Sequence, residues 1–364
     1  MAFGLYLHIP YCLAKCRYCD FYSKGGRRGV PDAYVEALAR AMAAYMAGRG
    51  QPPLRPDTLY FGGGTPSLLT PAQVRRLVDA ACPLPGAEVT LEANPETVTL
   101  ETLAGYRNAG VNRVSFGVQT ARPDSLARLG RPHTAAQSRQ ALAWARQAGF
   151  ENISGDIMLA LPHYSNSEFD ETLALLAGSG AVHISAYLLK VEPGTAFGRR
   201  PPQGLPSEDE AADFYLYAVD RLQQAGYAQY EISNFARPGY EGQHNLIYWN
   251  CQDYLGLGPA AHSCMDRRRF YWPGDTDAFI AGQASPLQDG ACGAEDFIML
   301  QLRLSKGLDL SALRRDYGAE LTPRQFGFIE KCVQAGYAAF DGKVLRLTPA
   351  GLIIQNSILA GLLG

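Results

Sequence analysis

The sequence predicts an α/β fold, in which six strand–helix units wind into a barrel or part of one and a helical, winged-helix-like domain follows. Apolar strands alternate with amphipathic helices over residues 1–226. Strands separated by helical patterns of about ten to fifteen residues imply parallel pairing with right-handed crossovers. Residues 227–292 break the alternation with a stretch rich in Tyr, Trp, Gly and Asn, which predicts a loop-rich segment. Residues 293–364 return to a helical pattern, so we expect three parts.

The strands of the first part are short apolar runs, and the helices are marked by their starting residues. The six expected strands cover residues 5–9, 58–61, 88–92, 113–118, 153–158 and 182–188. The first expected helix, residues 31–46, has apolar and aromatic residues at spacings of three and four. Capping boxes, in which a hydroxyl and a later Glu or Gln satisfy the first helical N–H groups, predict further helix starts. They begin at Thr70, Thr134 and Ser207.

The last part has the outline of a winged helix. Another capping box begins at Thr322, and a hairpin is expected at residues 337–347 around Asp341 and Gly342. Few basic residues cluster there. We therefore expect this part to pack against the rest of the chain or to dock a partner, and not to read DNA.

Composition narrows the class of protein. Hydrophobic residues make up 47% of the 364 residues and charged residues 19%, which excludes disorder, collagen and coiled coil as the main architecture. With a formal net charge of −2, the chain lacks the excess of positive charge that is typical of nucleic-acid-binding proteins. No apolar run reaches the about 18 residues of a membrane-spanning helix, and residues 1–10 lack the features of a signal peptide. We expect a cytoplasmic protein, in which the eight cysteines stay reduced.

Three cysteines stand together directly after the first strand. Cys12, Cys16 and Cys19 have the spacing C-x3-C-x2-C, and three thiolates on one loop form a soft site suited to zinc or an iron–sulfur cluster. The next cysteine is Cys82, so no fourth sulfur is nearby. Three protein ligands leave one metal position open, as in catalytic metal sites. The alternative is a structural zinc site that His8 completes.

Two glycine-rich stretches have different interpretations. Gly62, Gly63 and Gly64 end the second strand, where the lack of side chains lets a ligand approach the backbone closely. No Gly-Lys-Ser/Thr follows them, so they do not form a P-loop. Residues 256–261 imitate a dinucleotide-binding fingerprint, but the residues after them have no helical pattern, and we reject that interpretation.

The cysteine motif, with Tyr18 before its last cysteine, resembles that of the radical S-adenosylmethionine (SAM) superfamily. The resemblance implies that Cys12, Cys16 and Cys19 hold a [4Fe-4S] cluster, that SAM binds its fourth iron, and that the fold is a partial (βα)6 barrel. Six stretches in order along the chain resemble the family of oxygen-independent coproporphyrinogen III oxidases and their relatives. They are residues 5–10, 63–66, 92–95, 116–119, 129–131 and 155–156.

This family resemblance, which extends over essentially the whole chain, implies which residues contact SAM. They are Tyr6, Gly63, Gly64, Thr65, Glu92, Gln119, Arg131 and Asp156. The chemistry agrees with such a role, because carboxylates suit the hydroxyl and ammonium groups of SAM and an arginine suits its carboxylate.

Two groups within the family fit the chain differently. The decarboxylases of coproporphyrinogen III have a longer region before the cysteines and a further cysteine two residues after them, where this chain has Phe21. The haem chaperones carry the pattern His-Asn-x-x-Tyr-Trp, which this chain matches from His244 to Trp249. We therefore favour haem binding and transfer over decarboxylation, and leave open whether the chain is also an enzyme.

The same resemblance gives His244 a role in haem binding, since imidazole is a common haem ligand and aromatic side chains can form a wall for a porphyrin. From the residues alone, a histidine that caps loop carbonyls and a soft ligand at Cys251 are alternatives. The implied cofactors are the [4Fe-4S] cluster, SAM and haem. The implied partner is a haem-accepting protein, such as a respiratory haem enzyme. A homodimer, peripheral membrane contact and a zinc-stabilised protein without radical chemistry stay open.

Overall fold

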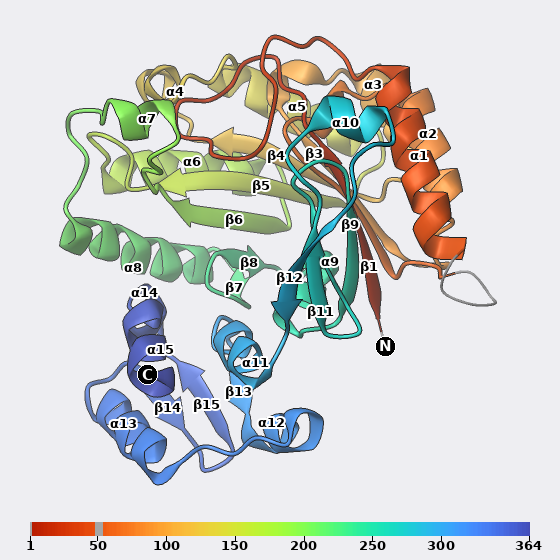
Figure 1. Cartoon of the computed structure of the whole chain (residues 1–364). Coiled ribbons are helices and arrows are strands. Elements are labelled where there is room, and N and C mark those ends of the chain that lie inside the picture. Colours follow the sequence, from red (N-terminus) through yellow and green to blue (C-terminus); the bar gives the residue numbers. More distant parts are fainter. Residues whose placement is uncertain (1, 48–53) are drawn as a thin grey trace.

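The computed structural model of the chain describes residues 2–47 and 54–364 (Figure 1). Residues 1 and 48–53, which belong to the first expected part, lie outside the described residues. Most of the chain forms one large sheet with helices packed against it, and a smaller domain sits below helix α8 in the view of Figure 1. None of the helices in the described part is both long and apolar enough to cross a membrane.

Six parallel strands form the centre of the sheet, as the alternating pattern predicts. In order they are β1 (Phe3–Ile9), β2 (Thr58–Gly63), β3 (Glu88–Ala93), β4 (Arg113–Gln119), β5 (Asn152–Leu159) and β6 (His183–Leu188). Each strand pairs in parallel with the next one along the chain. Because the six strands are parallel, their carboxyl ends lie at one rim of the sheet, where ligand sites of such folds lie.

Helices connect these strands and cover the sheet. They are α1 (Asp32–Ala47), α2 (Pro71–Ala81), α3 (Leu100–Asn108), α4 (Pro123–Leu129), α5 (Ala135–Gln147), α6 (Asn166–Gly178), α7 (Ala196–Arg199) and α8 (Glu208–Gln224), with short 3-10 turns at Pro66–Leu68 and Pro95–Thr97. The capping boxes predicted at Thr70, Thr134 and Ser207 are present. The predicted apolar face of α1 is buried, with Tyr34 and Leu38 fully covered by the core.

The segment expected to be loop-rich consists of short helices and strands that alternate with loops. It contains β7 (Ala228–Gln229), β8 (Asn234–Ala236), α9 (Gln243–Trp249), β9 (Asp253–Leu257), β10 (His262–Met265), β11 (Arg268–Tyr271), α10 (Thr276–Ile280) and β12 (Leu287–Ala291). These strands extend the sheet at both edges, with β9 parallel to β1 and β8 antiparallel to β6. They are only two to five residues long. Such short strands show too little alternation to be recognised from sequence.

The C-terminal part has its own core and a three-stranded sheet. Its elements are α11 (Ala294–Gln301), β13 (Leu308–Asp309), α12 (Leu310–Tyr317), α13 (Pro323–Gln334), β14 (Ala338–Phe340), β15 (Val344–Leu347), α14 (Pro349–Ile353) and α15 (Gln355–Leu363). The capping box at Thr322 and the hairpin around Asp341 are present, as predicted. Gln301 donates a hydrogen bond to the Trp249 carbonyl (2.7 Å), which ties this part to α9.

Candidate functional site at the carboxyl ends of the strands

A cavity of about 390 Å³ opens at the rim where the parallel strands end, and we call it the cluster cavity. It brings together ten of the twelve residues singled out from the sequence. They are Cys12, Cys16, Cys19, Gly63, Gly64, Thr65, Glu92, Gln119, Arg131 and Asp156. These residues come from the ends of five different strands and the loops behind them, so the fold alone makes them neighbours. Tyr6 and His244 lie outside this cavity.

Backbone hydrogen bonds hold the cysteine loop in place. The Cys12 N–H donates to the Lys24 carbonyl (3.0 Å), and the Cys12 carbonyl accepts from the Arg27 N–H (3.0 Å). A tight turn follows, in which the Cys19 N–H donates to the Cys16 carbonyl (3.3 Å). Burial raises the pKa of Cys19 to about 11, so without a metal ligand this group is a thiol at neutral pH. Metal binding would therefore release protons from the loop.

The donor set fits an iron–sulfur cluster better than a single zinc ion. Both nitrogens of His8 are occupied, Nδ1 by the Tyr6 hydroxyl (3.0 Å) and Nε2 by the Tyr22 carbonyl (2.9 Å), so His8 is not placed to complete a zinc site. Within residues 2–47 and 54–364, no three His, Cys, Asp or Glu side chains are arranged to hold a metal ion. In a [4Fe-4S] cluster each thiolate binds a different iron atom, so the three sulfur atoms do not have to converge on a single metal ion.

Two glycines line the cavity because a side chain would not fit. A Cβ on Gly64 would lie 2.7 Å from the Ile9 carbonyl oxygen and 2.8 Å from that of Tyr11. Gly63 has φ +111°, and a Cβ there would lie 2.5 Å from the His8 ring. The strand end therefore passes the cysteine loop at backbone distance and presents main-chain groups to the cavity.

Two partly buried carboxyl groups lie in the carboxyl-terminal halves of β3 and β5. Glu92 accepts hydrogen bonds from the Tyr60 hydroxyl (2.8 Å) and the Gly63 N–H (3.2 Å), and burial raises its pKa to about 7. Asp156 accepts from the Ser115 hydroxyl (3.0 Å), and burial raises its pKa too. Carboxylates that are costly to bury are retained where they meet a cationic or hydroxyl-bearing ligand.

Arg131 and Gln119 have features that are typical of a ligand site. Arg131 donates from Nη1 to the Asn94 side-chain oxygen (2.9 Å), but its buried Nε has no hydrogen-bond partner among the described residues. Gln119 has φ +65° at an irregularity of β4, a conformation that costs energy for a residue with a side chain. An unsatisfied buried donor and a strained backbone both indicate a site completed by something else, and an arginine suits a carboxylate.

A second cavity, of about 360 Å³, adjoins the first and shares Phe21, Gly63 and Glu92 with it. We call it the aromatic cavity, because five aromatic side chains and two histidines line it. They are Tyr6, Phe21, Tyr22, Tyr248, Tyr254, His8 and His262. Tyr6 thus lies next to the predicted SAM site and faces the neighbouring cavity.

His244 lies behind the wall of the aromatic cavity. Its side chain is buried; Nδ1 is 2.7 Å from the Thr58 hydroxyl and Nε2 is 2.5 Å from the Tyr248 hydroxyl. The ring stacks on Tyr60 with centroids 4.9 Å apart. Burial, together with the charge of Arg113, lowers the pKa of His244 to about 3, so the ring is neutral. Both nitrogens are in use, and in this geometry His244 supports Tyr248 from behind.

Sequence reasoning missed several residues of the cluster cavity. Asn94 holds Arg131, Ser115 holds Asp156, and Tyr187 at the end of β6 closes one side. Ser115 could have been found, because it lies on the same face of β4 as Gln119 at even spacing. Tyr187 carried no such signal, since it belongs to an apolar strand.

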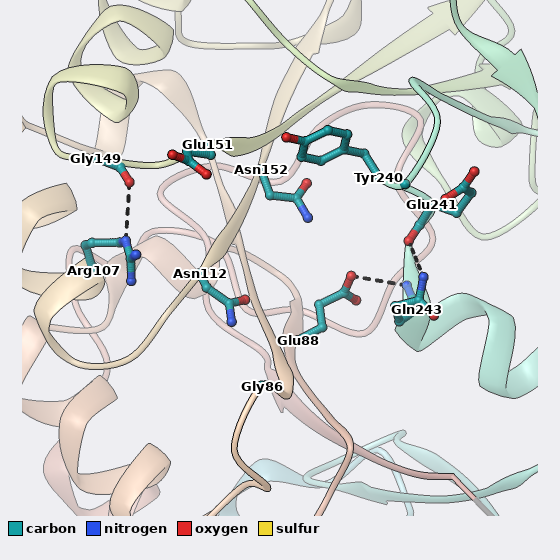
Figure 2. Close-up of a pocket in the computed structure, with 11 residues that line it drawn as sticks. Gly86, Glu88, Arg107, Asn112, Gly149, Glu151, Asn152, Tyr240, Glu241 and Gln243 are labelled. Atoms are coloured by element: carbon teal, nitrogen blue, oxygen red, sulfur yellow. Dashed lines mark hydrogen bonds between the residues drawn. The ribbon is translucent and has the colours of Figure 1, made fainter.

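A third cavity, of about 320 Å³, lies at the opposite, amino ends of β3, β4 and β5 (Figure 2). We call it the amino-end cavity. Its polar groups mostly bind one another: Glu88 accepts from the N–H groups of Gln243 and His244 (both 3.1 Å), and Arg107 donates to the Gly149 carbonyl (3.3 Å). None of the residues singled out from the sequence lines it.

Comparison with known proteins identifies the families that the chain resembles. Residues 6–176 match the radical SAM superfamily, and residues 293–354 match the HemN C-terminal domain. Among solved structures, the coproporphyrinogen III oxidase HemN from Escherichia coli is similar over 99% of this chain and 90% of its own, with a TM-score of 0.83 and 22% identity. That likeness supports the fold.

Curated relatives carry the resemblance along the whole chain. The heme chaperone HemW of Mycobacterium tuberculosis is 36% identical over all of this chain and 95% of its own. HemW of Bacillus subtilis is 32% identical over 99% of this chain and 98% of its own, and HemW of Escherichia coli is 42% identical over 71% and 69%. The chain therefore belongs to the HemW family of the radical SAM superfamily.

Proposed function

We propose that this chain is a haem chaperone, which binds haem and transfers it to an acceptor protein. The observation that carries the proposal is the similarity to curated heme chaperones, at 36% identity over the full length of the chain for the relative from Mycobacterium tuberculosis. The pattern from His244 to Trp249 supports it, because this stretch forms α9 and places Tyr248 in the wall of the aromatic cavity.

In this proposal Cys12, Cys16 and Cys19 hold a [4Fe-4S] cluster, and SAM occupies the rest of the cluster cavity. When bound, the cluster would supply the open iron and the electron that radical SAM proteins use to cleave SAM. The surrounding side chains bind and orient SAM. Arg131 offers its unsatisfied Nε to the carboxylate of SAM, and Glu92 offers an oxygen to a cationic or hydroxyl group.

Further predicted SAM contacts line the same cavity. Gly63, Gly64 and Thr65 present the end of β2, while Gln119 and Asp156 extend from β4 and β5. Tyr6 contributes from the side of the aromatic cavity. We propose that these residues enclose SAM and exclude water from the open iron.

Haem, in the same proposal, binds in the aromatic cavity. Tyr248 and Tyr254 lie with ring centroids 4.4 Å apart and form an apolar wall of the kind a porphyrin packs against. His244 takes part by fixing the Tyr248 hydroxyl through a hydrogen bond. Because Phe21, Gly63 and Glu92 line both cavities, we expect a ligand in one cavity to alter ligand binding in the other.

The acceptor that this function requires is a protein with an empty haem site, such as a respiratory haem enzyme. The C-terminal part, with its separate core, is our candidate for docking it. Self-association, peripheral membrane contact and a cytoplasmic location stay predictions from the sequence.

The alternative function is decarboxylation of coproporphyrinogen III. Two measurements on the anaerobically reconstituted chain decide between them. We expect ferric haem to produce a Soret band that saturates at one haem per chain, with and without the cluster. We also expect no protoporphyrinogen after incubation with coproporphyrinogen III, SAM and a reductant. Formation of protoporphyrinogen, or failure to bind haem, would contradict the chaperone proposal.

A further inference from the structure

We propose that His262 ligates the iron of haem bound in the aromatic cavity, an inference that rests on the proposed chaperone function. His262 is the first residue of β10 and lines the cavity. It lies outside the His-Asn-x-x-Tyr-Trp pattern that drew attention to His244 in the sequence.

The other two histidines near the cavity have no nitrogen to offer. His8 Nε2 must donate to the Tyr22 carbonyl, which can only accept, so its Nδ1 lone pair takes the Tyr6 hydroxyl. Each ring nitrogen of His244 lies within hydrogen-bond distance of a hydroxyl group. In either tautomer the unprotonated nitrogen therefore accepts a hydrogen bond and is not free for iron. Iron binding by either residue would have to break a hydrogen bond inside the protein.

His262 is exposed and oriented for such a role. Its side chain is 60% exposed, and no hydrogen bond from its ring to any described residue is present. Nδ1 lies 3.9 Å from a carboxylate oxygen of Asp289, and the ring stacks on Tyr271 with centroids 5.2 Å apart. A carboxylate near one imidazole nitrogen favours a ring orientation that leaves the other nitrogen for a metal.

The turn before His262 is rigid and strained, as expected for a segment that presents a ligand. Ala260 has φ +62°, a conformation that L residues with side chains rarely adopt. Its N–H donates to the Trp272 carbonyl (3.0 Å), and the Trp272 N–H donates to the Ala261 carbonyl (2.9 Å). Gly258 has φ +109°, and a Cβ there would lie 2.7 Å from the Tyr34 hydroxyl. The stretch that imitates a dinucleotide fingerprint therefore fixes a histidine at the cavity.

The test compares two matched variants of the full chain with the cluster reconstituted. In His262→Gln we expect the Soret band of the ferric haem complex to shift and the Kd for haem to rise about tenfold or more. His163→Gln changes an exposed histidine on the loop after β5 and should match the unchanged chain in both measurements. An unaltered spectrum and Kd in His262→Gln would overturn the assignment of His262.

Two further measurements keep the outcome clear. His262→Cys should replace the imidazole spectrum by that of a thiolate-ligated haem, with the far-ultraviolet circular dichroism of the unchanged chain retained. A spectrum identical to that of the unchanged chain would overturn the proposal. If the unchanged chain binds no haem, the chaperone function fails. If it binds haem and His262→Gln binds it identically, only the ligand assignment fails.

Discussion

The two ends of the parallel sheet carry cavities of similar volume, about 390 Å³ at the carboxyl ends of the strands and about 320 Å³ at the amino ends. At the carboxyl end, polar groups are left incomplete. The Nε of Arg131 has no partner among the described residues, the backbone of Gln119 is strained, and burial raises the pKa of Glu92.

At the amino end the polar groups are used to join structural elements (Figure 2). Asn112 accepts from the Val89 N–H (2.9 Å) and donates to the Ala87 carbonyl (2.8 Å), which fixes the start of β3 against that of β4. The exception is Asn152, whose side-chain oxygen has no partner in the described part of the chain. Volume, polarity and a single unsatisfied group therefore do not identify a ligand site, whereas an unsatisfied group combined with a strained backbone does.

The largest expected effect is the loss of the cluster when one cysteine of the loop is replaced. In Cys16→Ser we expect iron and sulfide content after anaerobic reconstitution to fall to near zero, and the broad absorbance of the cluster in the visible range to disappear. A hydroxyl is a poor ligand for iron–sulfur clusters, and two thiolates do not replace three.

The matched control is Cys82→Ser, which alters an exposed cysteine at the end of α2. It should bind as much iron as the unchanged chain. Full iron content in Cys16→Ser would mean that the cluster cavity does not hold the cluster. The two ends of the sheet would then no longer differ in function.

An intermediate effect is expected from Glu92→Gln, which keeps the shape of the side chain and removes its charge. We expect SAM to bind about tenfold more weakly or worse, since a hydrogen bond to a charged group contributes about 1.5–3 kcal/mol. Isothermal titration of the reconstituted protein with SAM measures this change. Unchanged affinity would exclude Glu92 from the SAM site.

The same residue predicts a pH dependence. Because burial raises the pKa of Glu92 to about 7, the carboxyl is mostly protonated below pH 7 and charged above it. SAM carries a permanent positive charge on sulfur, so its affinity should rise between about pH 6 and pH 8 as the carboxylate forms. The rise should be absent in Glu92→Gln, and a parallel rise in the variant would assign it to another group.

Most of the cluster cavity could be predicted from sequence, because the order and direction of the strands determine which residues line it. Once six strands run parallel, residues at their carboxyl ends, such as Glu92 and Asp156, must converge, however far apart they lie in the chain. The cysteine spacing then predicted the chemistry. The role of the glycines at the end of β2 could also be predicted, because only glycine lets the backbone there pass so close to the backbone of the cysteine loop.

Other features depended on contacts that no local pattern encodes. The pairing of β9 with β1 joins residues about two hundred and fifty positions apart, and the strand contains Gly256, which weakens its signal. The motif around His244 was visible, but its burial was not, because the two hydroxyls on its ring come from Thr58 in β2 and Tyr248 in α9. Hydrogen-bond partners from separate elements become known only with the fold.

The smallest expected effect is at the amino end, in Glu88→Gln. Glu88 accepts hydrogen bonds from the first N–H groups of α9, and a neutral amide would weaken them. We expect the free energy of unfolding in urea to fall by about 1 kcal/mol, with iron content and SAM affinity unchanged. If Glu88→Gln instead weakened SAM binding as much as Glu92→Gln, the amino-end cavity would be coupled to the ligand site. The amino-end cavity could then no longer be called structural in contrast to the cluster cavity.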